Sequence, residues 1–530
     1  MKYFFTILFA LVCFMAHGQG FSRLFNYSNN QNWFDSYIAS TYADSNYFFV
    51  TGVLSPDSLS FDKCFVAKMG YNGNVLWQAD AISPLLTSSF GGYSCMAKLH
   101  NGKYVVVAQG LDSVISEKIN VWEPFLYFFD SNNASHTLVS YMDSNIARSI
   151  NSITIDSMDN IIAAGSITSK SSHLDSFDHN YYYDSIALGL FKFNSSGNMI
   201  WQRVIMMKAN INGNSFVDAS RIINSADGMY YYITGAIEKP QGDFTQSFLL
   251  KTDTAGNVIW LKYIPHTTDL NNNTVPYSID IISAATGGGY FVSCDVVHVD
   301  TIDQGYLYYG RFDDNGNILW KKEFTRHPPP YTYFDGTTIA QSNDGNFLLQ
   351  GSYENEIYNP NLLKIDTFGN AMWYREYAYV NQFSPNQYLF TLSPVPDGRI
   401  LMGGYFYSQI KAPYFDTAGS VSWIVLTDSL GQRFPGDTSL VNFLIINSTP
   451  PLLSKVSIYP NPVNDKLYIN TFDQSNLTLQ ILDISGRILL SKQLQKGINV
   501  SDISQYVEGI YIAKILNNGA SVRVEKILKN

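Results

Sequence analysis

The residues of this chain that could do chemistry are spread thinly. The 530 residues include eight histidines and four cysteines. His173 and His179 lie close together in the polar stretch SSHLDSFDHNYYYD, but neither stands in an HExxH pattern or another metal-ligand spacing. Carboxylates are plentiful, and two of them could serve as acid and base wherever the fold brings a pair together. We therefore predict no catalytic, metal or cofactor residue, and keep open a hydrolase or lyase.

The cysteines and one acidic stretch favour structural roles. Cys64, Cys95 and Cys294 lie outside the N-terminal leader described below, and an odd number without CxxC spacing gives neither a disulfide framework nor a zinc site. One disulfide with one unpaired thiol remains an alternative, but we expect the three cysteines to serve as small apolar core residues. The stretch FDDNGNILW, 312–320, is similar to a calcium loop, yet it lacks the closing acidic residue and is better interpreted as a hairpin turn.

Aromatic residues give the best functional hint. Tyr and Phe gather beside Asp and other polar residues in DHNYYYD (178–184), HPPPYTYFDG (327–336) and YFYSQIKAPYFD (405–416), which we place in loops. Rings that stack on sugar faces, with polar groups that bind hydroxyls, would suit a polysaccharide site. The alternative is that most of these rings pack the edges of sheets.

A repeated turn and strand must position these loops. In DTAGNVIWLKYI, 253–264, an Asp and a Gly make a tight turn before an apolar strand. Apolar residues fill both alternation classes of that strand, which favours a strand covered on both faces. We expect the Trp after each turn to pack between neighbouring sheets. The Gly and Trp of the five strong copies are Gly73 and Trp77, Gly197 and Trp201, Gly256 and Trp260, Gly316 and Trp320, and Gly369 and Trp373.

The repeats predict the fold. Weaker copies around Asn133 and Gly431 extend the series to seven, at intervals of 53 to 64 residues. A second series of seven strands ends in a small residue, at Gly52, Gly110, Gly165, Gly235, Cys294, Gly351 and Gly404. Seven units with about four strands each predict an all-β, seven-bladed β-propeller over residues 19–440. The segment FSRLF, Phe21–Phe25, resembles the strand missing after the seventh turn, so we expect it to complete the last blade.

The repeats also resemble a known family. The DxxGNxxW turns and the stretch DSMDNIIAAGSIT are similar to the seven-bladed propeller repeats of secreted bacterial proteins. This resemblance covers about residues 20–440. It implies the fold and leaves the function open, because propellers host enzymes, lectins and scaffolds.

Composition and the N-terminus restrict the partners. The chain is 46% hydrophobic and 15% charged, and residues 19–450 carry a net charge of −14, which argues against nucleic acid. Residues 1–18 read as a signal peptide cleaved before Gln19. A lipoprotein signal at Cys13 is disfavoured because Val12 is larger than such a signal needs. No later stretch has the roughly 18 apolar residues of a membrane helix, so we expect no transmembrane segment after cleavage.

A second domain follows the ring. Pro450 and Pro451 mark a linker over residues 441–454. Beyond it, the alternation of Leu477, Leu479 and Ile481 with polar residues predicts a small β-sandwich over 455–530, with one solvated side per sheet.

This C-terminal domain resembles a sorting signal. YPNPVNDKLYI, ILDISGRIL, VEGIYIAKI and VEKILK are similar to the C-terminal sorting domain (type A) of the type IX secretion system of Bacteroidetes. The matching residues are Pro460, Asn461, Pro462, Gly486, Gly509, Tyr511, Lys526 and Lys529. The resemblance implies export by the type IX secretion machinery and a secreted or outer cell-surface location. We therefore expect a surface or secreted propeller that binds polysaccharide or protein, with a secreted polysaccharide hydrolase or lyase as the alternative.

Overall fold

Over the residues that it describes, the computed structural model consists of strands and turns. It describes residues 20–25, 35–55, 63–81, 88–90, 94–114, 120–132, 136–141, 146–169, 173–174, 181–182, 187–207, 216–238, 245–264, 274–283, 289–298, 305–325, 333–355, 357–377, 386–408, 419–434, 437, 444–446, 456–471, 477–483, 487–517 and 520–530. The predicted signal peptide, residues 1–18, lies outside these ranges. The chain divides into one unit of residues 1–317 and 321–446, and a second of residues 447–530 with 318–320.

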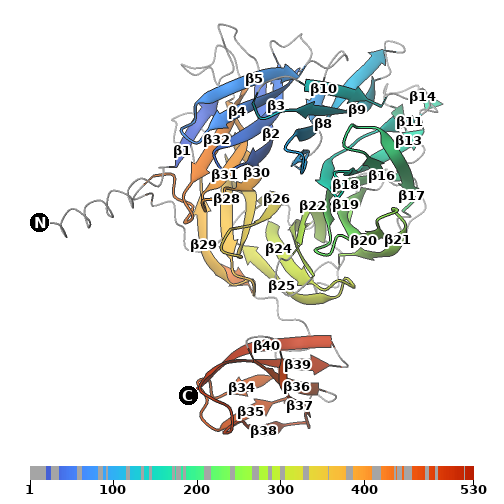
Figure 1. Cartoon of the computed structure of the whole chain (residues 1–530). Helices are drawn as coiled ribbons and strands as arrows, with labels where there is room; N and C mark the ends of the chain where they lie inside the picture. Colours follow the sequence, from blue (N-terminus) through green and yellow to red (C-terminus); the bar gives the residue numbers. More distant parts are fainter. Residues whose placement is uncertain are drawn as a thin grey trace, which may run out of the picture. The chain divides into compact units, whose positions relative to one another are not determined.

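The first unit is a ring of four- and five-stranded antiparallel sheets (Figure 1). The described strands form seven such sheets, which we number blades 1 to 7 in chain order. Blade 1 contains β2 (Asp35–Ala43), β3 (Tyr47–Ser55), β4 (Lys63–Gly70) and β5 (Val75–Ala81). Blade 2 contains β6 (Ser88–Phe90), β7 (Met96–Lys98), β8 (Tyr104–Val114), β9 (Asn120–Phe129) and β10 (His136–Ser140). Blade 3 contains β11 (Ile146–Arg148), β12 (Ser152–Ile155), β13 (Ile161–Ser169), β16 (Ala187–Phe193) and β17 (Met199–Ile205).

The remaining blades repeat this order. Blade 4 contains β18 (Phe216–Asn224), β19 (Tyr230–Glu238), β20 (Thr245–Asp253) and β21 (Val258–Tyr263). Blade 5 contains β22 (Thr274–Ser283), β23 (Tyr290–His298), β24 (Gly305–Phe312) and β25 (Ile318–Thr325), with β33 (Leu444–Ile446) added outside β25. Blade 6 contains β26 (Tyr333–Gln341), β27 (Phe347–Asn355), β28 (Ile357–Ile365) and β29 (Ala371–Glu376). Blade 7 contains β30 (Asn386–Pro394), β31 (Ile400–Ser408), β32 (Gly419–Thr427) and β1 (Phe21–Phe25). A small hairpin of β14 (His173–Leu174) and β15 (Tyr181–Tyr182) stands apart.

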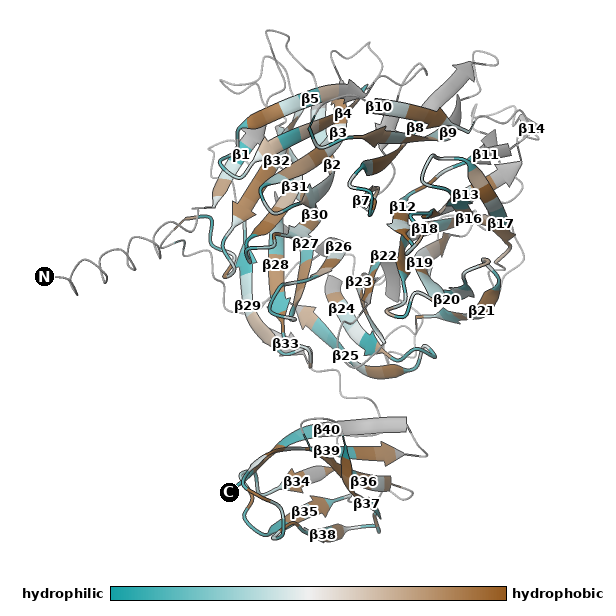
Figure 2. Ribbon diagram, viewed as in Figure 1, coloured by the Kyte–Doolittle hydropathy of each residue, from teal (hydrophilic) through white to brown (hydrophobic). Residues whose placement is uncertain are grey.

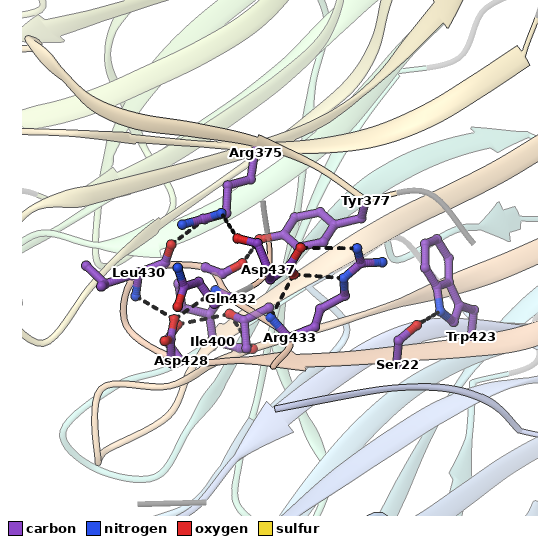
Figure 3. Close-up of polar contacts among 12 residues, drawn as sticks. Ser22, Arg375, Tyr377, Ile400, Trp423, Asp428, Leu430, Gln432, Arg433 and Asp437 are labelled. Carbon is purple, nitrogen blue, oxygen red and sulfur yellow. Dashed lines mark hydrogen bonds and ion pairs between the residues drawn. The ribbon is translucent and has the colours of Figure 1, made fainter. Parts of the chain in front are cut away.

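The N-terminal strand closes the ring, as predicted. β1 pairs antiparallel with β32, with Phe21 opposite Leu426 and Phe25 opposite Ser422. The indole Nε1 of the buried Trp423 donates a hydrogen bond to the Ser22 hydroxyl at 2.9 Å (Figure 3). Because the two ends of the ring share one sheet, opening the ring requires breaking that sheet.

The repeated turn is built around an Asp carboxylate. Asp253 Oδ1 accepts the amides of Ala255 and Asn257, at 2.9 and 2.8 Å, and its Oδ2 accepts the Asn257 side-chain amide at 2.8 Å. Gly256 has a φ of 81°, a left-handed conformation that Gly adopts without strain. Asp313 makes the same bonds to its own turn. The stretch that is similar to a calcium loop is therefore a hairpin turn, as predicted.

The apolar strand after the turn is not covered on both faces, and that prediction is wrong. Val258 and Ile259 are each 48% exposed, because β21 is the outermost strand of its blade. Trp260 nevertheless packs against the next blade: a Cβ added to Gly316 would lie 3.1 Å from the end of its indole. The Trp residues therefore contact neighbouring turns while the strand edge remains open to solvent.

The second series of small residues has a steric cause. A Cβ added to Gly235 would lie 2.1 Å from the carbonyl oxygen of Asp218, far inside van der Waals contact. That carbonyl belongs to the inner strand β18, whose pairing with β19 shifts register between Ala219 and Arg221. The same close approach occurs at Gly52 and Gly404, to the inner-strand carbonyls of Tyr37 and Tyr388, and at Gly165, to the Ser149 carbonyl between β11 and β12. Each inner bulge thus requires a small residue opposite it.

Apolar side chains fill the space between the sheets. Hydrophobic residues concentrate on the strands and hydrophilic ones on the turns (Figure 2). Cys64, Cys95 and Cys294 are buried thiols within this packing, as predicted for core residues. Residues 441–454, predicted as a linker, include the short strand β33, which pairs with β25.

The second unit contains two small sheets. One orders β34 (Ser457–Tyr459), β35 (Lys466–Asn470) and β38 (Ile498–Asp502). The other orders β37 (Ile488–Gln493), β36 (Leu477–Leu482), β39 (Gly509–Asn517) and β40 (Ala520–Lys529). Leu477, Leu479 and Ile481 of β36 are buried in a shared core, with polar residues between them, as the alternation predicts.

Candidate functional site

The two ends of the ring differ in their connections. One end carries short turns, such as residues 44–46 between β2 and β3 and 254–257 between β20 and β21. The strand ends at the other end of the ring flank longer stretches of sequence, such as 378–385 before β30 and 409–418 after β31, which lie outside the described residues. Rigid scaffolds commonly present binding residues on their longer loops. We call this second end the long-connection end.

An aromatic cluster lies toward the long-connection end of the seam between blades 7 and 1. It comprises Tyr37 of β2, Tyr388 and Phe390 of β30, and Tyr405 of β31. The Tyr405 ring centroid is 4.9 Å from Tyr388, 5.4 Å from Phe390 and 6.4 Å from Tyr37. All four side chains are half-buried, so part of each ring meets solvent. The arrangement brings half-buried aromatic rings from three strands together at this seam.

Of the four residues in this cluster, the sequence analysis predicted only Tyr405 as a candidate binding residue. Tyr405 belongs to one of the three predicted aromatic loops and lies in β31. The described parts of the three predicted loops lie in strands, contrary to the prediction: 181–182 in β15, 333–336 in β26 and 405–408 in β31. Their other residues, 178–180, 183–184, 327–332 and 409–416, lie outside the described residues. Tyr37, Tyr388 and Phe390 were missed because they stand in strands, where aromatic residues ordinarily signal packing. His173 is described in β14, and His179 is not.

Charged residues elsewhere in the ring join blades. Arg221 Nη1 of β18 donates to Asp280 Oδ2 of β22 at 2.6 Å, and the Ile339 amide of β26 donates to the same oxygen at 2.8 Å. Burial raises the pKa of Asp280, although the Arg221 charge opposes this effect. One carboxylate thus connects blades 4, 5 and 6.

The short-turn end has carboxylates in the same role. Asp44 Oδ2 of blade 1 accepts hydrogen bonds from Lys98 Nζ and from the Tyr104 hydroxyl of blade 2, each at 2.6 Å. Burial alone would raise the pKa of Asp44, but these bonds outweigh it and lower the pKa to about 2. The charged form of Asp44 therefore stabilises the seam between the two blades.

A histidine and a carboxylate also meet at this end. His100 Nδ1 lies 2.7 Å from Asp159 Oδ1, and the same oxygen accepts the His100 amide at 2.6 Å. Asp159, in the turn between β12 and β13, has a φ of 61°. The corresponding turn of blade 4, between β18 and β19, has Gly228 with a positive φ. An imidazole oriented by a carboxylate can act as a general base. Here the carboxylate also accepts the Asn101 amide, so it holds the turns of blades 2 and 3 together.

An ion pair between Arg433 and Asp437 holds the segment that follows β32. Arg433 donates through its amide and Nε to Asp437 Oδ2, at 3.0 and 3.1 Å, and Arg375 Nη1 donates to the Asp437 carbonyl at 3.3 Å (Figure 3). The Tyr377 hydroxyl donates to the Gly431 carbonyl at 3.0 Å. These bonds fix the last turn of blade 7 against the outer strand of blade 6, beside the closing strand.

In the second unit, the predicted sorting residues meet at the C-terminal strand. Asn461 Nδ2 donates to the Lys526 carbonyl at 2.6 Å, and its Oδ1 accepts the Leu528 amide at 2.9 Å. Pro460 and Pro462 flank Asn461 in this turn. The Val463 amide donates to the Leu528 carbonyl at 2.8 Å. The Pro-Asn-Pro turn therefore binds the last strand through both side chain and backbone.

The other predicted sorting residues support the same strand. Gly509 pairs with Lys529 across β39 and β40, and Tyr511 pairs with Ile527. The Tyr511 hydroxyl donates to the Val507 carbonyl at 2.8 Å. Lys529 is buried, whereas Lys526 is exposed. Gly486 lies outside the described residues.

Comparison with known families identifies the second unit. Residues 457–530 match the secretion system C-terminal sorting domain. The prediction of a type IX sorting domain is confirmed. Such a domain directs the protein through the type IX secretion machinery to the cell surface or the medium. The chain is therefore a secreted or cell-surface protein with an all-β propeller and a type IX sorting domain. No curated protein matches it. Within the described ranges, no helix is long and apolar enough to cross a membrane.

Several solved structures are similar to the chain. A Dyadobacter fermentans protein of unknown function is 11% identical and covers 78% of this chain and 99% of its own, with a TM-score of 0.43. The periplasmic gluconolactonase PpgL of Pseudomonas aeruginosa is 12% identical over 78% and 99%, with a TM-score of 0.39. The Dos1 propeller is 10% identical over 83% and 94%, with a TM-score of 0.37. Similarity this distant says nothing about activity, and the propeller assignment follows from the sheet order of this chain.

Proposed function

We propose that the ring is a binding module for polysaccharide or for a surface protein, with its contact surface at the long-connection end. The supporting observation is the half-buried cluster of Tyr37, Tyr388, Phe390 and Tyr405, whose ring centroids lie within 4.9 to 6.4 Å of Tyr405. Aromatic faces bury large apolar area, and Tyr hydroxyls can bond sugar hydroxyls or backbone groups. The cluster combines both properties.

Export agrees with such a role. A protein sorted to the cell surface or the medium meets polysaccharides and the proteins of other surfaces. The net charge of −14 on residues 19–450 disfavours strongly anionic ligands. Neutral polysaccharides are therefore the first ligands to test.

Affinity electrophoresis tests this proposal. The mature chain, residues 19–530, is run through native gels that contain a panel of algal, plant and bacterial polysaccharides. We expect one gel to retard the protein, and Tyr405→Ala to abolish that retardation. Tyr459→Ala is the matched control, because it removes a ring that is 41% exposed in the second unit.

The outcomes separate the functional classes. Retardation that survives both Tyr405→Ala and Tyr388→Ala would contradict the aromatic site. No retardation in any gel would exclude the polysaccharides tested and leave protein ligands. The same gels are assayed for released reducing ends or unsaturated sugars, which would favour the hydrolase or lyase alternative.

A further inference from the structure

The last strand of the sorting domain is bound on both of its edges. β40 stands at the end of its sheet, next to β39. The pairing with β39 continues to Lys529, which lies opposite Gly509. The outer edge of β40 is bound over its last residues by the turn around Asn461. Chain ends are commonly poorly ordered unless other groups tie them down, so this second contact decides how firmly the C-terminus is held.

Four hydrogen bonds make up this outer contact, which we call the β40 clamp. Asn461 makes two of them with one side-chain amide: Nδ2 donates to the Lys526 carbonyl at 2.6 Å, and Oδ1 accepts the Leu528 amide at 2.9 Å. The Val463 backbone makes the other two, because its amide donates to the Leu528 carbonyl at 2.8 Å and its carbonyl accepts the Asn530 amide at 3.0 Å. The clamp thus replaces a neighbouring strand along the end of β40.

A carboxamide suits this position because it carries a donor and an acceptor side by side, as a peptide group does. Asn461 is itself exposed, so it adds little apolar packing to the domain. Its two bonds to β40 are therefore its main contribution. A carboxylate of the same shape would still accept the Leu528 amide, but it would set an oxygen against the Lys526 carbonyl.

We infer that Asn461 is a positioning residue for sorting: it keeps the end of β40 bound, and the secretion machinery requires the sorting domain in that state. The family match of residues 457–530 assigns export to this unit. β40 is the last strand of the unit, and the clamp decides whether its final residues are held or free. Asn461 acts through the strand and does not have to touch the machinery.

The same domain contains a matched control. Asn499 Nδ2 donates to the Gln495 carbonyl at 2.7 Å, and its Oδ1 accepts the Gln495 amide at 2.8 Å. Asn499 lies in β38, which belongs to the three-stranded sheet and not to that of β40. It is 7% exposed, so Asn499→Asp should cost at least as much stability as Asn461→Asp. The pair therefore separates release of β40 from a general loss of stability.

Cell fractionation tests the inference with the full chain, residues 1–530, expressed in a bacterium that has a type IX secretion system. We expect the exported fraction of Asn461→Asp to fall by about tenfold, with the protein retained in the periplasm, because at least one clamp bond is lost. Asn499→Asp should be exported like the wild type. Normal export of Asn461→Asp would overturn the inference. Equal retention of both variants would also overturn it, because export would then follow the stability of the domain.

Hydrogen exchange of the purified chain shows whether the clamp has opened. Residues 526–530 should exchange faster in Asn461→Asp than in the wild type, while residues 466–470 of β35 keep their protection. If both segments lose protection, the domain has unfolded, and Asn461→Ala, which removes both bonds without adding a charge, replaces Asn461→Asp in both assays with the same expected results. Loss of export in a variant whose residues 526–530 keep wild-type protection would refute the positioning role, because Asn461 would then act without β40.

Discussion

Two glycines of blade 4 allow the stabilising effect of the contact between a repeat turn and the preceding blade to be measured separately from backbone strain. Gly256 and Gly228 both have positive φ, 81° and 69°. A Cβ at Gly256 would lie 2.8 Å from Arg203 Cγ and 3.0 Å from the Trp201 ring, whereas a Cβ at Gly228 would meet nothing within 4 Å. The Gly→Ala pair thus separates backbone strain from contact between blades.

The two changes should differ in free energy of unfolding. An alanine with positive φ costs about 1–2 kcal/mol at either site. Overpacking against Trp201 and Arg203 adds roughly 1–3 kcal/mol at Gly256 alone. We therefore expect a loss of about 1–2 kcal/mol for Gly228→Ala and about 2–5 kcal/mol for Gly256→Ala.

Urea unfolding followed by Trp fluorescence measures this difference. All eight Trp lie between residues 33 and 423, so the signal reports the ring and not the sorting domain. Midpoints are comparable only if the slope with urea is unchanged. Equal losses for both variants would refute the reasoning, because the turns would then not be clamped by the preceding Trp.

Three other changes follow from the same contacts. Deleting Phe21–Phe25 should cost several kcal/mol, because it removes the β1 pairing and the Trp423 hydrogen bond; an unchanged melting temperature would contradict ring closure. Asn461→Ala should speed hydrogen exchange at the Leu528 amide, whereas exchange that matches the control Thr478→Ala would show that Asn461 does not hold β40. Because the folded pKa of Asp44 is about 2, below its ordinary 3.8, its stabilising contribution is present above about pH 4 and is lost as pH falls toward 2. The melting temperature of Asp44→Asn should therefore fall less between pH 5 and 3 than that of the wild type; equal falls would assign the acid sensitivity to other carboxylates.

Features that depend on local chemistry were predictable. The Asp carboxylate that closes a turn bonds amides two and four residues away, so its pattern repeats in the sequence. The C-terminal sorting domain was also found from short motifs. Closure by Phe21–Phe25 was predictable because Phe21 and Arg23 repeat the spacing of the repeat Trp and its following basic residue.

Other features depend on which strand lies at an edge. The sequence of β21 is apolar in both alternation classes, and we wrongly expected it to be covered. In the ring it is an outermost strand, and Val258 and Ile259 are half exposed. The aromatic cluster was likewise not predictable as a group, because Tyr37 and Tyr405 are 368 positions apart and meet only after the ring closes.

The sequence by itself determined the repeating unit, the closing strand and the C-terminal sorting domain, because hydrogen bonds within a turn and strand alternation act over a few residues. Only the tertiary structure decided which apolar strands stay exposed, which carboxylates join blades, and which aromatic rings form one surface. Those outcomes depend on packing between segments far apart in the chain. Gly235 combines the two: its place in the repeat is visible in the sequence, but the Asp218 carbonyl that forbids a larger residue comes from the neighbouring strand of the folded blade.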